Sequence, residues 1–297
     1  MKTLFITGTA SGFGRATVER FAEEGWAVAA TVRRAEQLDL FGNLPNVRVY
    51  VMDVTDAAQV ASVAQAALND FGRIDVVVNN AGFAHYGPLE TSGMDQIRAQ
   101  FETNYFGLVA VCQAFIPHLR IQGSGTIVNV ASLSSKMGFP FFTTYSASKA
   151  AVAVLSEGLA IELAPFGIQV KAIFPGAHAT RIFTKMDAGL GGEYLAYLPY
   201  LRNFFAAQSG VSKVSSPEGI AQLIWKAVGG GRDRYEYIGG RDAVFLLTLK
   251  RLLPQAVWKR LQTNSLLKPP SAVQLRFLSW VMRGTHQLEV KADSRLD

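Results

Sequence analysis

Tyr145 and Lys149 stand four residues apart at the start of a segment whose apolar residues repeat with a helical period. Residues at this spacing lie one turn apart on the same helix face. A free tyrosine has a pKa of about 10, which is too high for effective proton transfer at neutral pH. A neighbouring ammonium group stabilises the tyrosinate form. The pair is therefore a candidate for general acid–base chemistry, although Tyr-x-x-x-Lys by itself is common by chance.

A glycine-rich loop near the N-terminus predicts a binding site for a dinucleotide. Residues 7–14 follow a short apolar run, Thr3–Ile6, which is typical of a buried parallel strand, and from Arg15 the pattern becomes helical. A diphosphate must approach the backbone amides at the N-terminus of such a helix, and a Cβ at Gly12 or Gly14 would block it. Glycines after a strand often form only a turn, but the strand before and the helix after favour the binding site.

Two arginines follow the second expected strand, Ala27–Val32. Arg33 lies nineteen residues after Gly14, where an acidic residue would bind the ribose 2′-hydroxyl of NAD. Arginine at this position suits the 2′-phosphate of NADP instead, through charge-assisted hydrogen bonds, and Arg34 adjoins it. The alternative is that both arginines only end a strand at the surface. We favour NADP, because no carboxylate stands at the position that would select NAD.

Five motifs together resemble the classical short-chain dehydrogenase/reductase (SDR) family. They are Thr-Gly-x-x-x-Gly-x-Gly from Thr7, Asn-Asn-Ala-Gly from Asn79, Ser132 thirteen residues before a tyrosine, Tyr-x-x-x-Lys itself, and Pro-Gly-x-x-x-Thr ending at Thr180. One of these motifs is weak evidence, whereas the combination is hard to reach by accident. The resemblance covers about residues 1–240 and gives out beyond them.

The resemblance implies an α/β fold, a Rossmann-type doubly wound parallel sheet in a three-layer α/β/α sandwich with strand order 3-2-1-4-5-6-7. Residues 1–240 would form the catalytic domain, with a substrate lid at about 178–215, and residues 241–297 a C-terminal helical extension. The ligands would lie at the carboxyl ends of the strands. The remaining strands are expected at Val47–Val51, 74–78, Gly125–Val130, 168–173 and 235–238, with a helix at Pro217–Val228.

The implied reaction is reversible hydride transfer between NADP(H) and a small-molecule alcohol or its ketone or aldehyde. Tyr145 would transfer the proton, while Lys149 and the oxidised nicotinamide stabilise its tyrosinate form. Lys149 would also bind the nicotinamide ribose, and Ser132 would orient the substrate oxygen. Asn104, the fourth catalytic candidate, would hold a water that links Lys149 to bulk solvent.

The motifs and the resemblance also assign residues to the cofactor and suggest no metal site. The cofactor-binding candidates are Gly8, Ser11, Gly12, Phe13, Gly14, Arg33, Arg34, Asp53, Val54, Asn80, Ala81, Gly82, Tyr145, Lys149, Pro175, Gly176 and Thr180. Asp53 would accept a hydrogen bond from the adenine amino group. It also precedes Thr55 and Asp56, the cap candidates of a helix that runs to Phe71, so a structural role is open. Asn80 would tie neighbouring strands as well as contact the cofactor.

Residues outside these motifs have structural interpretations. A long helix is expected at 94–119, with Asn104 on an apolar face and its last turn bent or loosened by Pro117. His85 is expected to be a solvated loop residue without a catalytic role. Cys112, the single cysteine, is expected to pack in a helix, so an internal disulfide is excluded.

Composition narrows the function classes. The chain has 297 residues, of which 49% are hydrophobic, and this suits one α/β domain with a large core and an appendage. Its net charge of +6 is spread along the chain, which favours a solvated surface over a nucleic-acid interface. The N-terminal apolar run is too short for a signal peptide, and no apolar run reaches the length of a membrane span. A cytoplasmic protein is the default expectation.

Substrate and partners are less constrained. Phe139, Phe141, Phe142 and lid residues such as Ile182, Phe183 and Tyr194 favour an apolar carbonyl substrate, although aromatic packing alone would explain them. The resemblance implies a homodimer or homotetramer. Rival interpretations are a non-catalytic NADP sensor on the same fold, or a protein that binds a membrane or partner through its basic, leucine-rich extension. We expect the extension to pack near the lid and narrow the substrate entrance, with a membrane contact as the secondary expectation.

Overall fold

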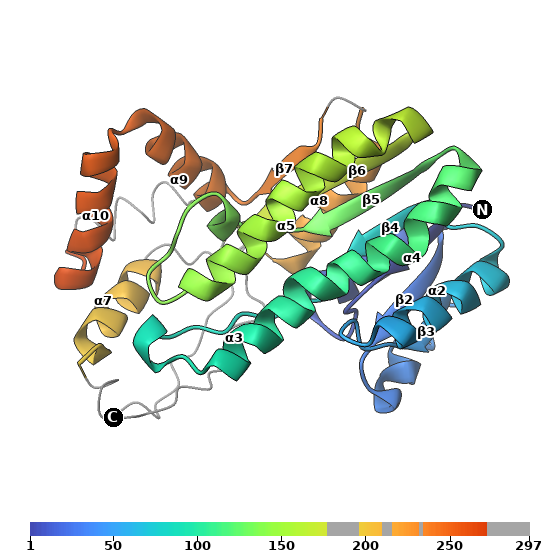
Figure 1. The fold of residues 1–297 in the computed structure, drawn as a ribbon, viewed down its shortest axis with the longest axis horizontal. Helices are drawn as coiled ribbons and strands as arrows, with labels where there is room; N and C mark the ends of the chain where they lie inside the picture. Colours follow the sequence, from blue (N-terminus) through green and yellow to red (C-terminus); the bar gives the residue numbers. More distant parts are fainter. Residues whose placement is uncertain (177–195, 210–215, 232–233, 272–297) are drawn as a thin grey trace.

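The computed structural model describes residues 1–176, 196–209, 216–231 and 234–271, which form a three-layer α/β/α sandwich (Figure 1). Its middle layer is a seven-stranded sheet in the order β3-β2-β1-β4-β5-β6-β7, and every neighbouring pair is parallel. The expected doubly wound fold and strand order are therefore confirmed. The strands are β1 (Thr3–Ile6), β2 (Ala27–Val32), β3 (Val47–Val51), β4 (Val76–Asn79), β5 (Gly125–Val130), β6 (Ile168–Pro175) and β7 (Glu236–Gly239).

Helices cover both faces of the sheet, as parallel strands require, because each crossover must return to the same end of the sheet. The α-helices are α1 (Gly12–Glu23), α2 (Ala57–Phe71), α3 (Met94–Phe101), α4 (Gly107–Gln122), α5 (Thr143–Glu162), α7 (Leu198–Ser209), α8 (Pro217–Val228), α9 (Arg241–Leu252) and α10 (Gln255–Leu267). Short 3₁₀ turns are η1 (Ala35–Phe41), η2 (Leu89–Thr91), η4 (Leu133–Ser135) and η5 (Ala164–Phe166), and η3 (Glu102–Phe106) is a π-helix.

Two hydrophobic clusters hold the three layers together. Successive strand residues point to opposite faces, so Phe5 and Ile127 pack with α2, α4 and α5. Their neighbours Ile6 and Val128 belong to the second cluster, with α1 and α8. Burial on both faces explains why β1 and β2 read as continuous apolar runs rather than as alternating patterns.

The helical extension packs at the end of the sheet toward which the strands point, where α7, α9 and α10 lie together (Figure 1). Trp258 of α10 packs with Leu246 of α9 against a cluster that contains Leu133. Asn203 of α7 donates a hydrogen bond to the backbone oxygen of Leu266, over 2.7 Å. The described part of the extension thus packs on the body, as expected. The rest of it, and the greater part of the expected lid, lie outside the described residues.

The prediction of one regular helix at 94–119 is wrong in detail. The π-helical turn η3 interrupts it between α3 and α4, and Asn104 lies in that turn. The helix also continues past Pro117 to Gln122, because its end is set by Gly123, whose φ of 67° gives a left-handed cap. Among the described residues, no helix has both the length and the apolarity needed to cross a bilayer.

Candidate active site

The loop between β1 and α1 forms a cradle of bare backbone. Gly8 and Gly12 have φ angles of 71° and 59°, a left-handed conformation that glycine adopts without strain. A Cβ added to Gly14 would lie 2.6 Å from the side-chain nitrogen of Asn80 and would also strike the carbonyl oxygen of Gly8. Asn80 donates hydrogen bonds to the backbone oxygens of Thr7 and Gly8, over 2.9 and 3.0 Å, so its expected role in tying the strands is confirmed.

This cradle fits the diphosphate of a dinucleotide. The loop leads directly into the N-terminus of α1, where unpaired backbone amides and the helix dipole favour an anion. Ser11 is the N-cap residue, and its side chain makes no capping hydrogen bond. The glycine positions are thus explained by close backbone approach, and the residues present fit the group that the sequence predicted.

The expected adenine end of the site lies beyond β2 and β3. Arg33 and Arg34 are both exposed just after β2, and neither forms an ion pair within the described ranges. The side chain of Asp53 accepts hydrogen bonds from the backbone and the hydroxyl of Thr55, at 3.0 and 2.8 Å. Asp56 is the N-cap of α2 and accepts from the amide of Gln59, so Asp53 does not cap the helix itself. Its contact with adenine stays a prediction.

The four expected catalytic residues come from three separate elements. Ser132 follows β5, Tyr145 and Lys149 lie on the first turns of α5, and Asn104 lies in η3. Gly82, after β4, brings two of them together, because a Cβ there would lie 2.9 Å from the side-chain oxygen of Asn104 and 3.3 Å from the ammonium nitrogen of Lys149. The sheet therefore collects these residues at the carboxyl ends of β4 and β5.

Asn104 is buried and is held on both sides of its amide. Its oxygen accepts a hydrogen bond from the backbone nitrogen of Phe83 at 2.9 Å. Its nitrogen donates to the oxygen of Phe83 and to the hydroxyl of Ser148, over 2.9 and 3.1 Å. The expectation that Asn104 is a buried amide with partners is confirmed. The water that it would hold stays a prediction.

Lys149 is 4% exposed, and its ammonium group donates a hydrogen bond to the backbone oxygen of Val130 over 2.8 Å. Burial lowers the pKa of Lys149 to about 8, because desolvation penalises the charged form. The hydrogen bond to Val130 places the ammonium group at the carboxyl end of β5.

Tyr145 is half-buried, and burial raises its pKa to about 12, while a hydrogen bond with Ser132 acts in the opposite direction. The expected downward shift is therefore absent from the cofactor-free chain. The desolvation of the phenol outweighs the effect of positive charge on its pKa, and the Lys149 ammonium group donates its hydrogen bond to the Val130 oxygen rather than to the phenol. The phenol is consequently held in the protonated form that a proton donor needs.

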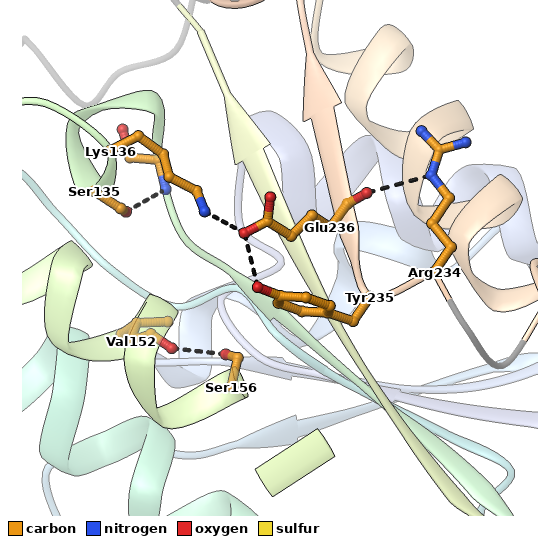
Figure 2. Close-up of polar contacts among 8 residues, drawn as sticks. Ser135, Lys136, Val152, Ser156, Arg234, Tyr235 and Glu236 are labelled. Atoms are coloured by element: carbon orange, nitrogen blue, oxygen red, sulfur yellow. Dashed lines mark hydrogen bonds and ion pairs between the residues drawn. The ribbon is translucent and has the colours of Figure 1, made fainter. Parts of the chain in front are cut away.

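Contacts that the sequence analysis missed support the turn after Ser132. The Ser132 hydroxyl oxygen accepts from the amide and the hydroxyl of Ser134, at 3.2 and 2.9 Å. Figure 2 shows that Lys136, one residue beyond η4, forms an ion pair with Glu236 of β7, whose carboxylate also accepts from the Tyr235 hydroxyl at 3.0 Å. These partners lie 100 residues apart in the sequence, so no local spacing could have revealed them.

The end of β6 is fixed in a similar way. Gly176 donates its amide to the oxygen of Gly239 over 2.7 Å. The carboxylate of Asp242, which is 3% exposed, packs so closely on Gly176 that a Cβ there would collide with it. No sequence motif predicted a role for Asp242. Thr180, the last residue of the same motif, lies outside the described residues.

An aromatic cluster adjoins Tyr145. It consists of Ala84, Tyr86, Phe141, Phe142, Leu201 and Phe204, with Phe139, Tyr145, Tyr197, Leu198 and Leu266 packed against it. Phe141 has a φ of 64°, which costs energy for a residue with a Cβ, and its oxygen accepts from Gly87 at 2.8 Å. His85 is 7% exposed and lies 3.3 Å from the Ser92 hydroxyl, so the expectation of a solvated histidine is wrong. Its neighbours Ala84 and Tyr86 belong to the cluster, so this part of the chain is buried.

A family model described as short chain dehydrogenase matches residues 2–190. The chain belongs to this family. Among curated relatives, a 3-ketodihydrosphingosine reductase from Bacteroides thetaiotaomicron is 39% identical over 58% of this chain and 62% of its own length. An uncharacterized oxidoreductase, YusZ, from Bacillus subtilis is 32% identical over 89% of this chain and 98% of its own. The match to the first relative thus spans less than two thirds of that protein.

Solved structures extend the likeness to the fold. A short-chain dehydrogenase from Streptomyces avermitilis is 35% identical with a TM-score of 0.74, over 89% of this chain and 96% of its own. A Burkholderia cenocepacia member in complex with NADP has 29% identity and a TM-score of 0.70, over 88% and 99% of the two chains. A Burkholderia phymatum member in complex with NAD has 26% identity and a TM-score of 0.73, over 84% and 92%.

This short-chain dehydrogenase is accordingly an oxidoreductase that acts on CH–OH groups with a nicotinamide cofactor. In the part of the chain that the structure describes, no group of three His, Cys, Asp or Glu side chains could hold a metal ion.

Proposed function

We propose that the protein interconverts an apolar alcohol and its ketone or aldehyde with NADP(H), using Ser132, Tyr145 and Lys149. One observation carries the proposal: the sheet and α5 bring these side chains together, with Asn104, at the strand ends beside a glycine cradle that fits a diphosphate. This spatial arrangement supports the proposal more strongly than the sequence motifs do, because hydrogen bonds hold each of these side chains in position.

In the direction of reduction, a nicotinamide cofactor held at the glycine cradle would supply the hydride for the carbonyl carbon, and the protein supplies the proton. Tyr145 donates its hydroxyl proton to the substrate oxygen as negative charge develops there. The Ser132 hydroxyl donates a hydrogen bond to the same oxygen and orients the carbonyl. Lys149 provides positive charge near the tyrosinate that remains, and its ammonium group would bind the ribose of the nicotinamide. A proton from solvent then restores Tyr145 for the next turnover.

Two observations support an apolar substrate. The aromatic cluster lies beside Tyr145, and the Bacteroides relative is named for the reduction of 3-ketodihydrosphingosine, a ketone with a long apolar chain. Aromatic side chains supply a large apolar contact area, so a substrate with an extended apolar part would be held next to the proton donor. A panel of ketones of increasing apolar size, followed by the loss of NADPH absorbance, tests this part. A preference for small polar ketones would contradict it.

NADP rather than NAD is supported by Arg33, whose guanidinium is exposed and unpaired by any carboxylate within the described ranges. A homodimer or homotetramer remains part of the proposal, and its test is the mass of the protein in solution. The non-catalytic NADP sensor is not favoured, because the catalytic side chains are all present.

The substitution Tyr145→Phe tests the chemical assignment. It removes only the hydroxyl, so the rate should fall about 10²–10⁴-fold while NADPH binding, measured by fluorescence, stays within about twofold. Tyr105→Phe, a matched change in η3, should leave the rate unaltered. A Tyr145→Phe variant that keeps more than about a tenth of the rate would show that another group transfers the proton.

A further inference from the structure

The helix α10 has two faces with different surroundings. Trp258, Gln262 and Leu266, spaced by four residues, point toward the body. Trp258 and Leu266 join two hydrophobic clusters, and Gln262 donates a hydrogen bond to the Gly138 oxygen over 3.2 Å. This inner face therefore packs on the body, beside the aromatic cluster and the turn after Ser132.

The outer face of α10 carries apolar and basic side chains together. It consists of Val257, Arg260, Leu261, Asn264 and Leu267, whose spacing of three, four, seven and ten places them along one side of the helix, and Lys268 follows directly as the C-cap residue. The exposed fractions of Val257, Leu261 and Leu267 are 43%, 47% and 57%. Apolar side chains that are exposed along one face of a helix are typical of a surface that binds a membrane or another molecule.

The charge around this outer face has one sign. Between positions 243 and 271 the chain has five Lys and Arg residues and no Asp or Glu. Arg260 and Lys268 form no ion pair in the part of the chain that the structure describes. Leu252, the last residue of α9, is also an apolar side chain with high exposure, at 74%.

We propose that the outer face of α10 binds the surface of a membrane that contains anionic lipids. Leucine and valine enter the boundary between headgroups and acyl chains, while Arg260 and Lys268 contact the lipid phosphates. The contact is peripheral, because the described helices include none that could span a bilayer. Docking through this face would hold the aromatic cluster, against which Leu266 packs, close to the lipid surface.

Charge and composition favour lipid over the other occupants. A second copy of this chain, related by a twofold axis, would place the cations of one outer face against those of the other, which is unfavourable. Nucleic acid would meet exposed leucine and valine rather than aromatic side chains on which bases stack. An anionic bilayer provides both the negative charge and the apolar layer that this face requires.

Vesicle sedimentation with the full chain tests the proposal. The protein should sediment with vesicles of phosphatidylcholine that contain about 30% phosphatidylglycerol, and it should remain in the supernatant with pure phosphatidylcholine. The combined change Arg260→Glu with Lys268→Glu should lower the partition coefficient at least tenfold, because each cation near an anionic surface adds about fivefold. Leu261→Gln, which keeps the charge, should lower it severalfold by removing apolar burial.

A matched control reverses two exposed charges elsewhere, Arg98→Glu in α3 with Lys226→Glu in α8, and should sediment like the wild type. NADPH binding and thermal melting show that each variant is folded. The proposal is overturned if the wild type ignores anionic vesicles or if both double variants lose binding equally. It is also overturned if the α10 double variant changes the mass of the protein in solution while vesicle binding is absent, which would identify a second copy as the occupant.

Discussion

Arg33 carries the proposed choice between NADP and NAD, because it is an exposed cation directly after β2. We expect Arg33→Asp to shift the ratio of kcat/KM for NADPH over NADH toward NADH by at least tenfold, since a carboxylate repels the 2′-phosphate and binds the 2′-hydroxyl. Arg34→Asp, the matched control one residue later, should shift it less. If only Arg34→Asp changes the ratio, the selecting cation is Arg34.

Lys149 should make the stability of the cofactor-free protein depend on pH. Its pKa is about 8 in the folded chain against an ordinary 10.5, so between these values the unfolded chain binds more protons. The free energy of unfolding therefore rises with pH in this window, by about 2 kcal/mol between pH 7.5 and 9.5. Tyr145 acts in the opposite direction only above pH 10, because its pKa is raised to about 12.

Lys149→Met should remove this rise and stabilise the apo protein at neutral pH while it abolishes turnover. Denaturant unfolding at several pH values measures the slope, and Lys226→Met, a change at an exposed lysine of α8, is the control that should keep it. An unchanged slope in Lys149→Met would mean that the buried lysine does not titrate in this window.

At the scale of elements, the first turn of α1 depends on close approach between two loops. Gly14→Ala should weaken cofactor binding at least tenfold and destabilise the protein by about 2 kcal/mol, because a Cβ meets Asn80 and the Gly8 carbonyl. Gly219→Ala at the start of α8 meets nothing within 4 Å and should be neutral or slightly stabilising. Fluorescence titration with NADPH and thermal melting distinguish them. Equal behaviour of the two variants would remove the steric argument.

At the scale of the whole molecule, the sheet separates two cores. Ile127 and Ile6 are both fully buried, on opposite faces, so Ile127→Val and Ile6→Val should each cost about 1 kcal/mol. Because their side chains share no cluster, the double variant should equal the sum within about 0.5 kcal/mol. Denaturant unfolding measures all three. A coupling well above that value would indicate that the two layers respond as one packed unit.

The sequence by itself determined the features that depend on neighbouring residues. Periodicity and flanking glycines fixed β1, β2, β5 and α8 at their observed bounds, because continuous apolar runs and helical spacing are local properties. Motif spacing brought Tyr145 and Lys149 onto one helix face, because four residues make about one turn. The glycine cradle was also predictable, since a loop between a strand and a helix that must approach a diphosphate leaves no room for a Cβ, as the structure shows at Gly14.

Only the tertiary structure decided which residues meet across long separations and how deeply they are buried. The ion pair of Lys136 with Glu236 and the packing of Asp242 on Gly176 depend on strand order, which places β7 and α9 beside the end of β6. The raised pKa of Tyr145 follows from desolvation by surroundings that no local pattern describes. Side chains far apart in sequence come into contact only when the strands and helices pack together, so their partners and pKa values are properties of the assembled fold.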